Sequence, residues 1–246
     1  MPRAADIPEI SQIFLSATAQ DCREYREAVR DFVQANEPAA KISLQEDWAA
    51  GGEFVVDVCE RRVKNCDAYM GLFGHRYGWI PPGFTRSITE LDFRWAVEHW
   101  SQPVPPIFVL LPEKGSEADE NLAASARPLL AREFPDEHNR AAAVRAQQDF
   151  LASVVDWVAD GRILVYYRNQ LQLVGKALSC ILHWNQELLR QACAGRRQPI
   201  GDIPAAELGR IGRGEQQTAL SEALDAFRER LGQRALAFLV HGPENH

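Results

Sequence analysis

The stretch Ala68-Tyr-Met-Gly-Leu-Phe73, followed by Gly74-His-Arg-Tyr-Gly78, points to the fold of this chain. Its first six residues carry no charge and include two aromatic side chains, as expected of a strand buried on both faces. The glycines at 74 and 78 allow the backbone to turn sharply. The three residues between them are therefore expected beyond the carboxyl end of a central strand, where open α/β sheets bind their ligands.

A helix is expected to begin after this loop. Pro81, Pro82 and Gly83 exclude regular structure, and Ser87 can cap the helix that follows. Glu90 stands three residues after Ser87, which is the spacing of a capping box. The same position places a carboxylate beside the predicted site, so Glu90 is either a helix cap or a functional residue.

Further apolar runs alternate with amphipathic stretches on both sides of this centre. The other expected strands are residues 12–16, 42–44, 106–111 and 163–167, and the expected helices are residues 21–34, 54–63, 87–102 and 171–193. An insertion at residues 113–160 is expected to add one or two helices, the clearer at residues 140–157. Strands that alternate with helices in this way predict a parallel sheet covered on both faces.

Composition narrows the class of protein. The 246 residues carry a formal net charge of -7, which argues against a surface that coats nucleic acid. The five cysteines are odd in number and form no C-x-x-C pair, which favours a reduced, cytoplasmic setting. We find no signal peptide, no run long enough for a membrane span and no metal-ligand spacing. We expect a cytoplasmic protein without a metal site.

Residues 12 to about 190 resemble the TIR-like domains at the N-termini of STAND-class NTPases. The matching residues are Ile-Phe-Leu-Ser-Ala-Thr at 13–18, Asp21 with Arg26-Glu27, Cys66 to Gly78, and Ser-Ile-Thr-Glu-Leu-Asp-Phe at 87–93. The resemblance implies an α/β, TIR/flavodoxin-like three-layer fold, with a five-stranded parallel sheet in the order 2-1-3-4-5. The helical insertion would lie between strands 4 and 5.

The end of the chain has a different composition. We expect residues 1–194 to form the TIR-like domain and residues 195–210, with their prolines and glycines, to form a linker. Residues 211–246 are similar to the start of a STAND NTPase module. No Gly-Lys-Ser/Thr phosphate loop follows, so we expect this module to be incomplete through truncation.

The resemblance also implies a function. It implies an effector or signalling domain of a bacterial antiphage immune protein, which self-associates and hydrolyses NAD at the nicotinamide N-glycosidic bond. NAD would be the substrate, and no cofactor is expected. Glu90 is the implied catalytic carboxylate. The alternatives are a non-enzymatic adaptor that acts through assembly, and a nucleoside-processing enzyme that uses the same Glu90.

The loop from Gly74 to Tyr77 is the first group of expected binding residues. His75, Arg76 and Tyr77 could bind a phosphate or an adenine, because Arg76 suits a pyrophosphate by bidentate hydrogen bonding and Tyr77 could stack on a base. The structural alternative is that Arg76 pairs with a carboxylate and stiffens the loop. Its expected partners are Glu46, Asp47 or Asp92.

Two further groups complete the expected site. Glu46, Asp47 and Trp48 follow the second strand, where the family carries a mobile lid loop. The carboxylates there could bind ribose hydroxyls, while Trp48 could equally be a half-buried anchor. Ser16 and Thr18 match the family's first-strand motif, yet serine and threonine at a turn are also ordinary caps.

Overall fold

The computed structural model describes residues 11–44, 54–100, 106–158 and 163–194. The chain divides into two units, residues 1–194 and residues 195–246. The predicted linker and NTPase-like module lie outside the described residues and stay predictions.

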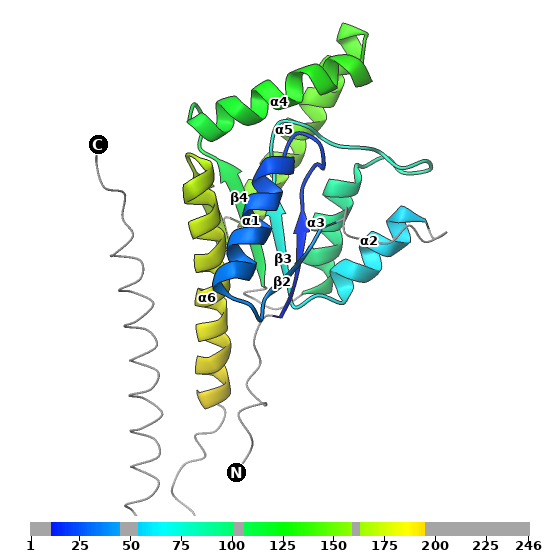
Figure 1. The fold of residues 1–246 in the computed structure, drawn as a ribbon. Helices are drawn as coiled ribbons and strands as arrows, with labels where there is room; N and C mark the ends of the chain where they lie inside the picture. Colours follow the sequence, from blue (N-terminus) through cyan, green and yellow to red (C-terminus); the bar gives the residue numbers. More distant parts are fainter. Residues whose placement is uncertain (1–10, 45–53, 101–105, 159–162, 195–246) are drawn as a thin grey trace, which may run out of the picture. The chain divides into compact units, whose positions relative to one another are not determined.

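Five strands form one parallel sheet (Figure 1). They are β1 (Gln12–Ser16), β2 (Lys41–Ser43), β3 (Ala68–Leu72), β4 (Ile107–Pro112) and β5 (Ile163–Tyr167). The order is β2-β1-β3-β4-β5, and every neighbouring pair is parallel. The predicted α/β fold class and strand order are therefore confirmed.

Six helices of the described residues connect and follow the strands. They are α1 (Arg23–Asn36), α2 (Val55–Lys64), α3 (Ile88–His99), α4 (Glu117–Glu133), α5 (Glu137–Val158) and α6 (Gln170–Ala194). The insertion contributes two of them, α4 and α5, where the sequence predicted one or two. In Figure 1, α4 lies near the end of the sheet at which β4 terminates.

Alternating side chains of the strands build a core on each face of the sheet. Ile13 and Met70 face one core with residues of α1 and α6. Phe14 and Tyr69 face the other, which residues of α3 and α5 complete. Because both faces are covered, β3 is buried at all five positions, which explains why its sequence is a continuous uncharged run.

Gly78 brings the loop after β3 against the turn after β1. Its φ of +91° lies in the region that favours glycine. A Cβ there would lie 3.1 Å from Thr89 Oγ1 and 3.2 Å from Thr18 Cγ2. Gly74 differs, because its φ is not positive. A Cβ at Gly74 would lie 3.2 Å from Cys22 Sγ. The expected glycine-dependent turn therefore occurs at Gly78, whereas Gly74 allows close packing.

Gly78 and Gly83 form a matched pair for testing this constraint. Both have positive φ, but among the described residues no atom lies within 4 Å of a Cβ at Gly83. We expect Gly83→Ala to lower the free energy of unfolding by about 1 kcal/mol through backbone strain alone. Gly78→Ala should cost at least about 1 kcal/mol more, because the added methyl is also overpacked. Chemical denaturation measures both, and equal losses would show that crowding at Gly78 is unimportant.

Candidate functional site

The candidate site lies where β1 and β3 end side by side. Ser16 pairs with Gly71 in the parallel register, so the turn after β1 and the loop after β3 leave the sheet as neighbours. Ser87 then caps α3, because its Oγ accepts a hydrogen bond from the backbone N–H of Glu90 at 3.2 Å. Two strand ends and one helix start therefore meet at this edge.

The Glu90 side chain is buried and bound by three side chains. The Tyr77 hydroxyl donates a hydrogen bond to Oε2. Oε1 lies 2.6 Å from Arg94 Nη2 and 3.1 Å from Arg86 Nε. The Ser87 cap uses only the backbone of Glu90, so capping and the carboxylate contacts occur together. The Ser87 cap is therefore confirmed, and because it leaves the carboxylate free of the cap, the catalytic role of Glu90 stays a prediction.

Tyr77 contributes its hydroxyl rather than an open ring face. The residue is buried, and its ring makes an edge contact with Phe150 of α5 at a centroid distance of 6.5 Å. Burial, and then the hydrogen bond to Glu90, raise the pKa of Tyr77 to about 12. The hydroxyl therefore stays protonated at neutral pH and remains a donor to the carboxylate. Stacking of a base on this ring, as suggested from the sequence, would require α5 to move.

Arg86 and Arg94 are site residues that the sequence analysis missed. Each stands four residues from Glu90: Arg94 follows it by one turn on the same side of α3, and Arg86 precedes the Ser87 cap in the loop before the helix. Their side chains remain about half exposed, at 50% and 47%, while that of Glu90 is 8% exposed. The i, i+4 spacing of arginines around a glutamate was the signal that could have identified them.

These three residues line a pocket between α3 and α5. It has a volume of about 300 Å³, and Tyr77, Asp149 and Phe150 also contribute to its wall. The pocket thus combines one buried carboxylate, two arginines with room to move and an aromatic wall. Such a site suits a ligand that has both an anionic group and a ring.

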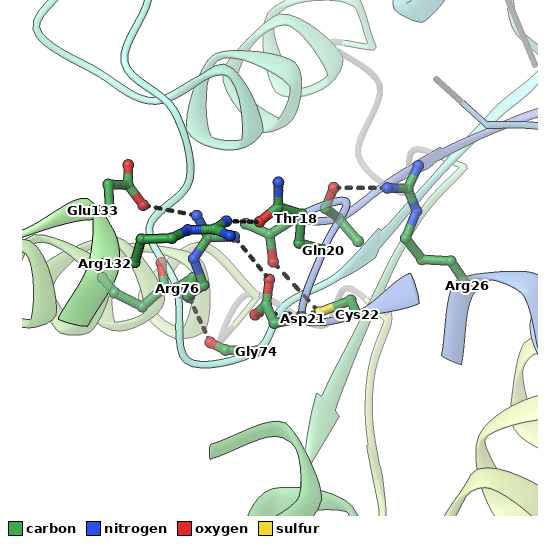
Figure 2. A network of polar contacts seen from close by, with 11 residues as sticks. Thr18, Gln20, Asp21, Cys22, Arg26, Gly74, Arg76, Arg132 and Glu133 are labelled. Atoms are coloured by element: carbon green, nitrogen blue, oxygen red, sulfur yellow. Dashed lines mark hydrogen bonds and ion pairs between the residues drawn. The ribbon is translucent and has the colours of Figure 1, made fainter. Parts of the chain in front are cut away.

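Arg76 joins three segments by ion pairs (Figure 2). Its Nη2 lies 2.8 Å from Glu133 Oε2 at the end of α4, and its Nη1 lies 3.4 Å from Asp21 Oδ1 in the turn after β1. The structural role weighed for Arg76 is therefore present, but with partners other than those expected. Asp92 instead accepts a hydrogen bond from Ser16 Oγ at 2.9 Å. Glu46 and Asp47 lie outside the described residues, as does Trp48.

The remaining predicted residues surround this network. Thr18 is buried, and its Oγ1 lies 3.4 Å from Cys22 Sγ. His75 Nε2 lies 2.8 Å from Asp119 Oδ1 of α4. The Gly74 carbonyl accepts a hydrogen bond from Gln147 Nε2 at 2.6 Å. Thr18, Gly74 and His75 therefore position the strand ends and the insertion, and none of these contacts reaches Glu90.

Asp92 is the most perturbed carboxyl group at this edge. Burial raises its pKa to about 8, while the hydrogen bond from Ser16 and the charge of Arg26 act weakly in the opposite direction. Burial, and then the negative charge that Asp92 carries once it is ionised, raise the pKa values of Tyr69 and Cys59. Asp92 is therefore expected to be largely protonated at neutral pH.

This protonation makes stability depend on pH. The folded protein keeps a proton on Asp92 that the unfolded chain releases near pH 4. The free energy of unfolding should therefore fall as the pH rises from about 4 to about 8. The slope should reach at most about 1.4 kcal/mol per pH unit. Asp92→Asn should remove this slope and keep an acceptor for Ser16. Denaturation at pH 5 and pH 8 tests this, with exposed Asp57→Asn as the control; a variant that differs from wild type equally at both pH values would contradict it.

The described residues contain neither a metal-ligand cluster nor a membrane-spanning helix. No group of three or more His, Cys, Asp or Glu side chains there could hold a metal ion. None of the described helices combines the length and hydropathy that a membrane span requires.

Comparison with known proteins places the chain in a family. No curated protein matches it significantly. Among solved structures, the TIR domains of the activated Roq1 resistosome, which directly recognises the pathogen effector XopQ, align with 72% of this chain and 99% of that chain. The identity is 11% and the TM-score is 0.41, a likeness too distant to indicate activity. A sequence model of a domain of unknown function, DUF4062, matches residues 12–154. That match spans more than half of the chain, which therefore belongs to the DUF4062 family.

Proposed function

We propose that this domain is a TIR-like signalling domain of a bacterial STAND-type immune protein, and that it cleaves nicotinamide from NAD when clustered. Glu90 is the proposed catalytic carboxylate. The observation that carries the proposal is the Glu90 pocket, in which a buried carboxylate lies beside two half-exposed arginines. The strand order and the polar side chains at the strand ends support a ligand site at this edge of the sheet.

Cleavage of the nicotinamide bond is favoured by a negative charge beside the ribose. As the bond between ribose C1′ and the nicotinamide nitrogen breaks, nicotinamide leaves with the bonding electrons and positive charge develops on the ribose. A water oxygen then attacks C1′ and loses a proton to solvent. A carboxylate fixed in a site with little water stabilises the developing charge more strongly than one in solvent. Glu90 fits this role, because Tyr77 holds one oxygen and the other faces the arginines.

The arginines must release Glu90 for it to act. With Arg86 and Arg94 both within ion-pair distance of Oε1, the negative charge of Glu90 is compensated. A pyrophosphate is a bidentate partner for arginine and would compete for both side chains. Since both are about half exposed, they can turn toward a bound dinucleotide without disturbing the core. Substrate binding would thereby uncover Glu90 and leave Tyr77 as its positioning residue.

Replacing Glu90 tests the proposal. Glu90→Gln keeps the size of the side chain and the backbone cap but removes the charge, so nicotinamide release from NAD by the artificially clustered protein should fall at least about a hundredfold. The free energy of unfolding should fall by about 1–3 kcal/mol, because charge-assisted hydrogen bonds are lost.

Glu98→Gln is the matched control, because it makes the same change at an exposed position of the same helix. It should retain activity. A folded Glu90→Gln variant that releases nicotinamide at the wild-type rate would exclude Glu90 as the catalytic residue. Consumption of free nucleosides, with NAD left intact, would instead favour the nucleoside-processing alternative.

The loop before α3 supports a second function, that of a non-enzymatic adaptor. Trp79, Ile80 and Phe84 are each more than 40% exposed on this loop. Large apolar side chains exposed together are typical of a surface that binds another protein. Here the partner would be a second copy of the domain, and assembly would be the signal.

Phe84→Ser separates this surface from the pocket. Phe84 is 43% exposed, so its loss should leave stability nearly unchanged while weakening self-association at least about fivefold. Sedimentation velocity over a concentration series provides the measurement. Leu171→Ser, at a 77% exposed position of α6, is the control and should assemble like wild type. Assembly that depends on Phe84, without any loss of NAD, would identify an adaptor; identical association of both variants would exclude the loop as the interface.

A further inference from the structure

We propose that a second cavity, between the loop after β3 and the α4–α5 hairpin, binds a small, uncharged aromatic molecule. The cavity is distinct from the Glu90 pocket and has a volume of about 560 Å³, within the range of small-molecule sites. The proposal does not depend on NAD cleavage, because Glu90, Arg86 and Arg94 do not line this cavity.

Three segments line the cavity, which is open to solvent on one side. Trp79 and Ile80 come from the loop, Phe134 follows α4, and Ala143 and its neighbours belong to α5. Most of the lining is apolar, and the loop aromatic Trp79 is 49% exposed. A ligand would therefore cover apolar surface that the described part of the chain leaves in contact with solvent.

The shape of the lining favours a flat ring. Ala142, Ala143 and Ala146 lie along one side of α5 and contribute only methyl groups, so they form a shallow floor. The lining also includes Trp79 and Phe134, whose rings can contact an aromatic ligand through their faces or edges. An aromatic molecule fits such a cavity better than a branched aliphatic one, because a flat body can contact the floor and both aromatic side chains.

The charges of the lining favour a neutral molecule. Its two charged side chains are Arg76 and Glu133, which pair with each other at 2.8 Å. Arg76 also contacts Asp21, as Figure 2 shows, so its charge is already compensated. An anion would lose hydration without gaining a free positive charge, and a cation would have to compete with Arg76 for Glu133. This distinguishes the cavity from the Glu90 pocket, where the arginines can turn toward an anion.

The two cavities share part of their walls. Tyr77 lines both, and its hydroxyl binds the Glu90 carboxylate. Ala146 of α5 lines both as well. A molecule in the larger cavity would therefore contact the residue that positions Glu90.

Three indole compounds of different charge test the proposal on the full chain. Indole is neutral, indole-3-acetate is an anion and tryptamine is a cation at neutral pH. Calorimetric titration should give indole a dissociation constant of about 1 mM or tighter, as expected of an efficient nine-atom ligand. The two charged compounds should bind at least about fivefold more weakly. Failure of indole to bind, or equal binding of all three compounds, would overturn the proposal.

Filling the cavity provides the structural control. Ala143→Leu places a larger side chain in the floor and should weaken indole binding at least about tenfold. Ala141→Leu makes the same change on α5 at a residue outside the lining and should leave binding unchanged. If Ala143→Leu fails to fold, Trp79→Ala takes its place as the test. It removes an exposed residue of the lining and should likewise weaken indole binding at least about tenfold. Undiminished binding in the folded cavity variants would show that indole binds elsewhere.

Discussion

The parallel pairing of β1 with β3 is the constraint on which the other features of this domain depend. Because Ser16 lies beside Gly71, β1 and β3 end next to each other at the same edge of the sheet. The turn after β1 and the loop after β3 must then share the same space. Gly78 makes this possible, with a positive φ and a backbone that lies against Thr18 and Thr89. The start of α3, and with it Glu90, is placed by this contact.

Charged groups gather at this edge, and each is compensated differently. Arg76 is paired with Asp21 and Glu133, and Glu90 with two arginines and a tyrosine. Asp92 accepts a hydrogen bond from the Ser16 hydroxyl and feels the charge of Arg26, but burial outweighs both and its pKa rises. Buried charge is expensive unless it is paired, so the arginine contacts stabilise both the loop and the carboxylate of the proposed active site.

The helical hairpin of α4 and α5 converts this sheet edge into two cavities. α5 supplies Phe150 behind the Glu90 pocket and the alanine floor of the apolar cavity. α4 supplies Glu133, whose ion pair with Arg76 holds the loop against the hairpin (Figure 2). The two proposed ligands differ in charge for this reason. In the Glu90 pocket, the half-exposed arginines can turn from Glu90 toward an anion. In the apolar cavity, Arg76 and Glu133 are already paired with each other.

The sequence by itself determined the strands, their order of alternation with helices, and the cap at Ser87. Those features depend on residue periodicity and on contacts between near neighbours, which a linear pattern records. It also placed Glu90 at the start of α3, although not its arginine partners at i-4 and i+4. Only the tertiary structure decided that Arg76 binds Asp21 and Glu133, that α5 covers Tyr77, and that Gly71 leaves room for the Phe73 ring, which lies 2.5 Å from where a Cβ would be. The contacts of Arg76 and Tyr77 join segments far apart in the chain, and their geometry follows from how the insertion packs against the sheet edge. The fit of Phe73 against Gly71 is local in sequence but depends on how the ring is held in the core.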